Sequence, residues 1–248
     1  MVALMKNIKL VIEYDGTNYS GWQRQKNAMT IQEKLEMAIQ KSTGKYCNTI
    51  GCSRTDSGVH ARQFTCNFLT DSKIPSSKFK MVLNSQLPED IVVLKSEEVD
   101  INFHSRYNTI GKEYSYTIII GNNRPAIGRN YIYYFQRRLN IDNMKTACKF
   151  FIGKHDFSAF KSNGSSAKTS VRTIKKFTVS KQENLIKFIV TGDGFLYNMV
   201  RIMVGTLLEV GVGRFSPEYV LDILRSKDRS KAGKPAPGRG LCLEKVFY

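Results

Sequence analysis

The chain has 248 residues, of which 42% are hydrophobic and 24% are charged, a composition typical of a globular protein with an ample core. Lysine and arginine number 38 against 21 aspartate and glutamate residues, so the net charge is +17. An excess of this size favours a polyanionic partner, with nucleic acid ahead of an anionic membrane surface. No stretch approaches eighteen consecutive apolar residues, which argues against a membrane-spanning helix.

The first part of the chain predicts strands and helices in the order βαββαβ. Thr30 followed by Glu33 is a capping-box pattern, and Gly44 is placed to end that helix. Pro75 is expected to open a second helix. The expected strands are residues 8–14, 47–52, 63–69 and 91–94, the last of which can extend to residue 99.

The second part of the chain repeats this order. Strands are expected over residues 114–120, 173–179, 185–190 and 241–247, and helices over 142–152, 195–210 and about 217–225. We therefore predict an α+β protein made of two ferredoxin-like βαββαβ halves, residues 1–105 and 106–248. Their sheets are expected to join into one mostly antiparallel sheet with helices on one face.

Cysteine and histidine are sparse and show no metal-site spacing. The five cysteines form no zinc or redox motif, and the three histidines are scattered. The single Gly192-Asp193-Gly194 is too little for a dinucleotide-binding loop. We therefore expect a protein of the reducing cytoplasm, without a metal or another cofactor.

The polar stretch Ser53-Arg54-Thr55-Asp56-Ser57-Gly58-Val59-His60-Ala61 lies between two expected strands. Aspartate, serine and glycine are ordinary turn residues, so a plain turn is one interpretation. A plain turn does not account for Arg54, Thr55 and His60, which are gathered around one carboxylate. Asp56 is ionised at neutral pH and can act as a nucleophile without an activating base, so a catalytic loop is the other interpretation.

Two residues of the second half are candidate partners of Asp56. An enclosed carboxylate needs a compensating cation, and Arg201 stands in a helix that is otherwise apolar from Met199 to Leu208. The alternative is that Arg201 reaches solvent beside Asn198. Tyr114 could give a flipped base a stacking surface, although a tyrosine on a strand is more often ordinary packing.

Basic residues cluster in three runs that contain few or no acidic residues. Such a run is ordinarily a solvated face, but three of them at this net charge favour a surface that follows a phosphate backbone. The middle run includes Arg172, Lys175 and Lys176, which we take as candidate contacts to an RNA backbone. The runs are Arg124, Arg129, Arg137 and Arg138; Lys161, Lys168, Arg172, Lys175, Lys176 and Lys181; and Arg225, Lys227, Arg229, Lys231, Lys234 and Arg239.

Residues 53–61 resemble the catalytic loop of the tRNA pseudouridine synthase A (TruA) family, which usually has Gly and Ala where this chain has Ser53 and Ser57. Residues 198–201, followed by Gly205 and residues 209–211, resemble a second block of that family. Further matches run in family order from about residue 12 to the end: residues 14–17, 21–23, 103–106, 155–160, 171–174, 236–237 and 240–241.

The resemblance implies a cofactor-free, metal-free isomerase that converts uridine to pseudouridine at positions 38, 39 and/or 40 in the anticodon stem-loop of tRNA. It implies that Asp56 is the nucleophile, or the base that takes the 2′ proton, and that Arg201 pairs with it. It further implies that Tyr114 stacks on the base and that Arg54 helps to hold the target nucleotide out of the stack. Family members act as homodimers, with one tRNA across both subunits.

Two other functions remain open from the sequence. A non-catalytic RNA-binding module on paired ferredoxin-like sheets would explain the charge and the fold, but not the combination of Asp56, Tyr114 and Arg201. A pseudouridine synthase that acts on another RNA is the second alternative.

Overall fold

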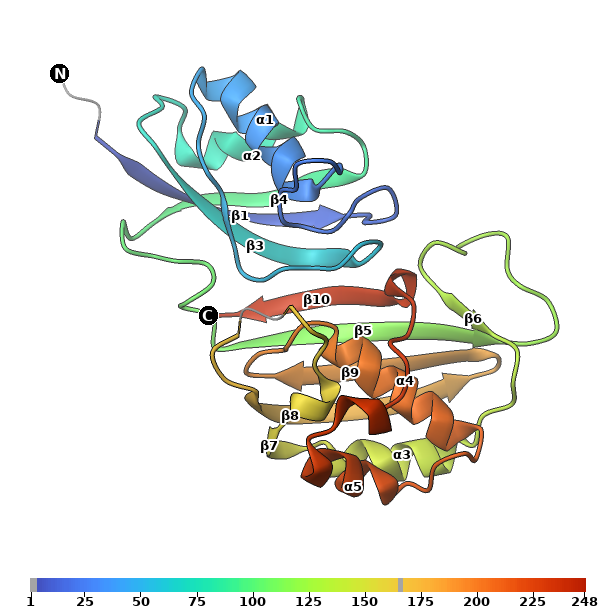
Figure 1. Ribbon diagram of the computed structural model, residues 1–248. Coiled ribbons are helices and arrows are strands. Elements are labelled where there is room, and N and C mark those ends of the chain that lie inside the picture. Colours follow the sequence, from blue (N-terminus) through green and yellow to red (C-terminus); the bar gives the residue numbers. More distant parts are fainter. Residues whose placement is uncertain (1–3, 165–166) are drawn as a thin grey trace. The chain divides into compact units, whose positions relative to one another are not determined.

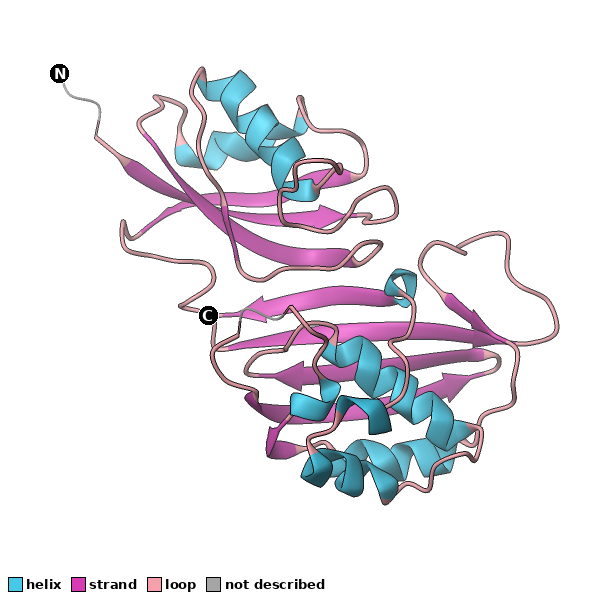
Figure 2. Ribbon diagram, in the orientation of Figure 1, coloured by secondary structure: helices cyan, strands magenta, loops and turns pink. Residues whose placement is uncertain are grey.

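The computed structural model describes residues 4–164 and 167–248, which form two compact units (Figure 1). The first unit contains the chain up to Ile110 together with Leu243–Tyr248, and the second contains Gly111–Cys242. In each unit the helices cover one face of a β-sheet (Figure 2). The expected α+β class is confirmed.

The first unit has the predicted order of strands and helices. Its sheet has the strand order β4-β1-β3, with β2 paired to β3, and all these pairings are antiparallel. The elements are β1 (Lys6–Tyr14), α1 (Ile31–Thr43), β2 (Ile50–Gly51), β3 (His60–Thr70), α2 (Phe79–Asn84) and β4 (Ile91–Val99).

Local signals in the sequence account for the limits of α1. The Thr30 hydroxyl accepts a hydrogen bond from the Glu33 backbone N–H, and Gly44 ends the helix with a left-handed φ of 75°. The apolar stripe of Ile31, Leu35 and Ile39 is fully buried. The helix expected after Pro75 is shorter than its pattern suggested, because a 3₁₀ turn at Ser76–Lys78 precedes α2.

The second unit has the strand order β5-β9-β8-β7 with antiparallel pairing, and β6 adds to β5 in parallel. The strands are β5 (Gly111–Ile120), β6 (Tyr133–Phe135), β7 (Gly153–Asp156), β8 (Val171–Gln182) and β9 (Leu185–Gly192). The last strand, β10 (Leu241–Phe247), begins in this unit and continues as part of the first. The helices are α3 (Ile141–Phe150), α4 (Met199–Gly211) and α5 (Tyr219–Ser226).

The structure differs from the sequence prediction at three elements of this unit. The short strands β6 and β7 were not predicted, since neither has an apolar alternation of useful length. The helix expected over 195–210 begins only at Met199, because Asn198 adopts a left-handed φ of 60° that interrupts the helical repeat. No helix in the described ranges is long and apolar enough to cross a membrane.

Candidate active site

Asp56 lies in the connection between β2 and β3, so the predicted strand-to-strand loop is confirmed. Its side chain is partly buried, while that of Thr55 is buried and that of Arg54 is exposed. The Val59 backbone N–H donates to the Asp56 carbonyl oxygen at 3.2 Å, which closes a tight turn through Gly58. Asp56 therefore stands at the start of a turn, with an arginine that projects to solvent two residues before it.

The segment after β1 braces this loop from the side. The hydroxyl groups of Tyr14 and Thr55 lie 2.9 Å apart, and both side chains are buried. The Trp22 backbone N–H donates to the Thr55 carbonyl oxygen at 3.2 Å, and Gly58 N–H donates to the Tyr19 carbonyl oxygen at 3.2 Å. The residue before the Asp56 turn and a glycine within it are thus tied to the same neighbouring segment.

Two glycines allow these segments to approach each other. A Cβ atom on Gly16 would lie 2.0 Å from the Val59 carbonyl oxygen, and one on Gly21 would lie 2.1 Å from the Thr55 carbonyl oxygen. Contacts this short cannot exist, and Gly21 also has a φ of +89°. Any side chain at either position would displace the backbone of the Asp56 loop.

His60 supports the loop from its C-terminal end. Its side chain is buried, and its Nδ1 atom lies 3.0 Å from an Asp15 carboxylate oxygen and 3.1 Å from the Gly16 backbone nitrogen. Nδ1 donates to Asp15 when it carries a proton and accepts from Gly16 when it does not. In either state His60 joins the beginning of β3 to the turn after β1, which is a structural role in this loop.

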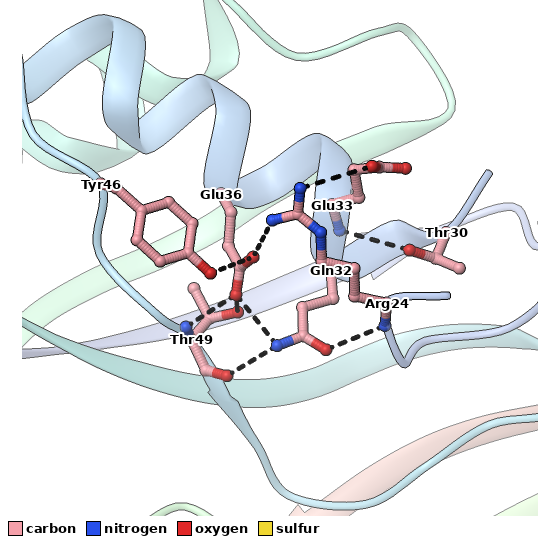
Figure 3. A network of polar contacts seen from close by, with 7 residues as sticks. All are labelled: Arg24, Thr30, Gln32, Glu33, Glu36, Tyr46 and Thr49. Carbon is pink, nitrogen blue, oxygen red and sulfur yellow. Dashed lines mark hydrogen bonds and ion pairs between the residues drawn. The ribbon is translucent and has the colours of Figure 1, made fainter. Parts of the chain in front are cut away.

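A buried carboxylate anchors the far end of the bracing segment (Figure 3). Glu36 of α1 is 1% exposed and accepts hydrogen bonds from Arg24, Gln32, Tyr46 and both the N–H and the hydroxyl of Thr49. Gln32 also accepts from the Arg24 backbone N–H at 3.1 Å. The network fixes the segment after β1 and the approach to β2 on the same helix.

Tyr114 lies in β5 of the second unit, opposite Val190 of β9. It is 6% exposed, and its ring meets that of Phe195 edge to face, with centroids 5.2 Å apart. Phe195 stands just before α4, so the packing of this pair couples the strand to the segment that leads into the helix.

Arg201 is in the first turn of α4, and its guanidinium donates to a backbone and a side-chain oxygen. Nε donates to the Ala236 carbonyl oxygen and Nη1 to the Asn198 side-chain oxygen, both at 2.7 Å. The Asn198 amide in turn donates to the Ser162 hydroxyl at 3.0 Å. The contact with Asn198 was not predicted from the sequence, and it orients the guanidinium of a partly buried side chain.

The segment near Ala236 packs against α4 without an intervening side chain. The Ala236 N–H donates to the Arg201 carbonyl oxygen at 3.0 Å, and a Cβ atom on Gly205 would lie 1.8 Å from the Lys234 carbonyl oxygen. This contact explains why a glycine stands in the middle of an otherwise apolar helix.

The three candidate RNA-backbone residues lie in β8, but they differ in their contacts. Arg172 is partly occupied by the local backbone, since its Nη1 donates to the carbonyl oxygens of Thr169 and Val171. Lys175 and Lys176 are both exposed, at a register shift in the β8–β9 pairing. The two lysines are therefore better placed than Arg172 to contact a polyanion.

The site residues fall into two groups. Arg54 and Asp56 share one loop of the first unit, and Tyr114 and Arg201 belong to the second unit. Sequence reasoning missed Tyr14 and Glu36, which position the loop. Within residues 4–164 and 167–248, no group of three or more His, Cys, Asp or Glu side chains could hold a metal ion.

The family model and the curated relatives that match the sequence agree on one family. The sequence model of a family described as tRNA pseudouridine synthase matches residues 10–108 and 147–248. The tRNA pseudouridine synthase A of Clostridium kluyveri is 69% identical over 98% of this chain and 100% of its own length, and that of Clostridium acetobutylicum is 57% identical over the same shares. A solved Cbf5-Nop10-Gar1 complex matches at 12% identity with a TM-score of 0.40, covering 95% of this chain and 48% of that chain. The chain therefore belongs to the tRNA pseudouridine synthase family, whose members are isomerases that convert uridine to pseudouridine.

Proposed function

We propose that the protein isomerises uridine to pseudouridine at positions 38, 39 and/or 40 in the anticodon stem-loop of tRNA. The observation that carries the proposal is the Asp56 loop, which is braced on both sides in a chain that matches tRNA pseudouridine synthases over their full length. The net charge of +17 fits a polyanionic substrate.

Each site residue has a proposed role. Asp56 attacks the sugar or removes its 2′ proton, and as a carboxylate at neutral pH it needs no activating base. Arg201 compensates the charge of Asp56, a role supported by a guanidinium whose direction is fixed by Asn198 and Ala236. Tyr114 stacks on the target base, and the exposed Arg54 holds that nucleotide out of the stack.

The experiment that tests the catalytic assignment is Asp56→Asn, which keeps the shape of the side chain and removes its charge. Pseudouridine is mapped in unmodified tRNA after incubation with each protein, and tRNA binding is measured in parallel. We expect binding to persist while product falls to background. Normal turnover by the variant would favour a different catalytic residue, and product in another RNA but not in tRNA would overturn the substrate assignment.

The role of Arg201 is tested by two substitutions of different severity. Arg201→Lys keeps the positive charge but loses the forked donor geometry, whereas Arg201→Ala loses both. We expect the lysine variant to fold better than the alanine variant and still to be slow. A double-mutant cycle with Asp56→Asn measures the coupling, and strictly additive effects would assign the compensating charge to another residue.

We also propose that the protein works as a homodimer in the cytoplasm. All five cysteines are free thiols in the structure, which fits a reducing compartment. Sedimentation of the purified protein with and without tRNA tests the oligomeric state, and a monomer under both conditions would contradict it.

A further inference from the structure

An exposed aromatic stack stands in the segment between β4 and β5, within the first unit. The rings of His104 and Tyr107 lie face to face, with centroids 4.1 Å apart and an interplanar angle of 24°. One face of the Tyr107 ring therefore packs on His104. The Tyr107 side chain is nevertheless 76% exposed to solvent. An aromatic ring that is exposed and held in place offers a flat surface on which another ring can stack.

The stack is rigid because hydrogen bonds close the turn beneath it. The His104 Nδ1 atom lies 3.2 Å from the Arg106 backbone nitrogen and 3.3 Å from that of Tyr107, and it accepts from both. The His104 N–H donates to the Asn108 side-chain oxygen at 2.7 Å, and the Asn108 N–H donates back to the His104 carbonyl oxygen at 3.0 Å. A ligand that stacks here would therefore order little additional chain.

Buried polar side chains fasten this turn to the sheet. The Ser105 N–H and hydroxyl both donate to the Asn67 side-chain oxygen, and the Asn7 amide donates to the Phe103 carbonyl oxygen. The Tyr248 hydroxyl donates to the Ser105 carbonyl oxygen at 2.8 Å. The stack is thus built on β1, β3 and the C-terminal residues rather than on a free loop.

The turn that carries the stack is fastened to β3 far from Asp56, which lies in the loop before that strand. Asp56 precedes the start of β3 at His60, whereas the turn is fastened at Asn67, roughly 23 Å further along at the usual rise of a strand. Figure 1 shows the segment between β4 and β5 leaving the end of the first-unit sheet where β3 finishes. A contact at this distance belongs to a different nucleotide from the one that reacts.

We propose that His104, Arg106 and Tyr107 form a platform on which an unpaired base of the bound tRNA stacks. The Arg106 guanidinium lies 5.9 Å from the centre of the Tyr107 ring, so it reinforces the stack and offers a positive charge to the adjoining phosphate. The platform takes any base, because every base has a π-face that can stack on an aromatic ring. It deepens the proposed function, since it rests on tRNA being the substrate.

The test compares three variants by their affinity for unmodified tRNA at several salt concentrations. We expect Tyr107→Ala to weaken binding on the order of ten- to a hundredfold, with an unchanged salt slope, because stacking involves no counterion release. Tyr107→Trp should keep full affinity, and its fluorescence should be quenched when tRNA is added. Met81→Ala is the matched control, since Met81 is 64% exposed on α2 and should bind as the unaltered protein does.

Three results would overturn the platform. Equal affinity of Tyr107→Ala and the unaltered protein would do so, as would a Tyr107→Trp variant as weak as the alanine variant. If Tyr107→Ala converts an RNA-free dimer into a monomer in sedimentation, this face is an interface between copies of the chain and not a base platform. Failure of the unaltered protein to bind tRNA would instead contradict the proposed function itself.

Discussion

The buried hydroxyl groups of Tyr14 and Thr55 lie 2.9 Å apart, and this contact ties the residue before Asp56 to the last residue of β1. β1 is paired on both sides, to β3 and β4, and is therefore a firm part of the first unit. The position of the Asp56 backbone is in this way set by a central strand and not by the loop alone.

Loss of this contact should affect catalysis more than binding. We expect Tyr14→Phe to lower the free energy of unfolding by about 1 kcal/mol, the usual cost of one hydrogen bond. Turnover should fall by up to about 100-fold, because small displacements of reacting groups are costly. Single-turnover pseudouridine formation and urea unfolding measure the two effects. Thr55→Ser keeps a hydroxyl and serves as the control, and normal turnover by Tyr14→Phe would show that the contact does not position Asp56.

A pair of glycine substitutions separates backbone strain from displacement of the loop. Gly21 and Gly44 both have positive φ, of +89° and +75°, but they differ in their surroundings, since a Cβ atom on Gly21 would lie 2.1 Å from the Thr55 carbonyl oxygen. A Cβ on Gly44 would meet nothing within 4 Å. We expect Gly44→Ala to cost about 1 kcal/mol of stability and leave turnover intact, and Gly21→Ala to lose turnover at temperatures where it remains folded. Equal turnover in the two variants would contradict this role of Gly21.

Elements with local signals could be predicted from the sequence, and elements set by distant contacts could not. The limits of α1 follow from Thr30, Glu33 and Gly44, which act within one turn of the helix ends. The left-handed Asn198 has no such signal: its side chain contacts Ser162 and Arg201, and the first of these lies 36 positions away.

The same distinction applies to the candidate site. Arg54 and Asp56 could be placed in one loop because they are adjacent in sequence. Glu36 reads as an ordinary helix-surface glutamate, and only the return of the chain at Tyr46 and Thr49 buries it. Its importance is visible only in three dimensions.

The Glu36 network should contribute measurably to stability. Glu36→Gln keeps the shape but replaces an acceptor oxygen by an amide donor, which would face other donors. We expect it to lower the free energy of unfolding by about 1–3 kcal/mol, the cost of leaving buried groups unsatisfied. Glu33→Gln is the control, because Glu33 lies 3.7 Å from a half-exposed Arg24 and should cost less than about 1 kcal/mol. Equal losses in urea unfolding would contradict the importance of burial here.

Asp156 should make stability depend on acid pH. Hydrogen bonds from Ser158, with help from Ser170 and Lys227, hold the pKa of the Asp156 carboxyl well below its usual value. A lowered folded-state pKa stabilises the protein above the unfolded pKa of about 3.9, and this stabilisation is lost as the pH falls through the folded value.

We therefore expect Asp156→Asn to melt below the unaltered protein at pH 7, and the difference to shrink below about pH 4. Thermal unfolding at the two pH values measures it. Asp142→Asn is the control, since the Asp142 side chain is 88% exposed and pairs with a neighbouring lysine on the same helix. A difference for Asp156→Asn that stays constant with pH would show that its charge is not the stabilising feature.

Lys175 and Lys176 should contribute to the salt dependence of tRNA binding. The β8–β9 register shifts between Ile174 and Lys176, so two consecutive lysines are exposed between the buried Ile174 and Phe177. An unbroken strand would turn one of the two toward the core. If both lysines contact phosphates, replacing them with glutamine should make the log–log salt slope shallower by about 1.5, since each contact contributes roughly 0.7–0.9.

The matched control for this pair is Lys78→Gln with Lys80→Gln, which removes the same charge from exposed positions beside and within α2. The affinity for tRNA is measured from low to physiological salt. The shallower slope should appear only in the Lys175 and Lys176 variant. Because net charge is equal in the two variants, a long-range effect of charge alone would change both slopes alike. That result would place the RNA-backbone contacts on another of the basic runs and leave the bulge as a structural feature of β8.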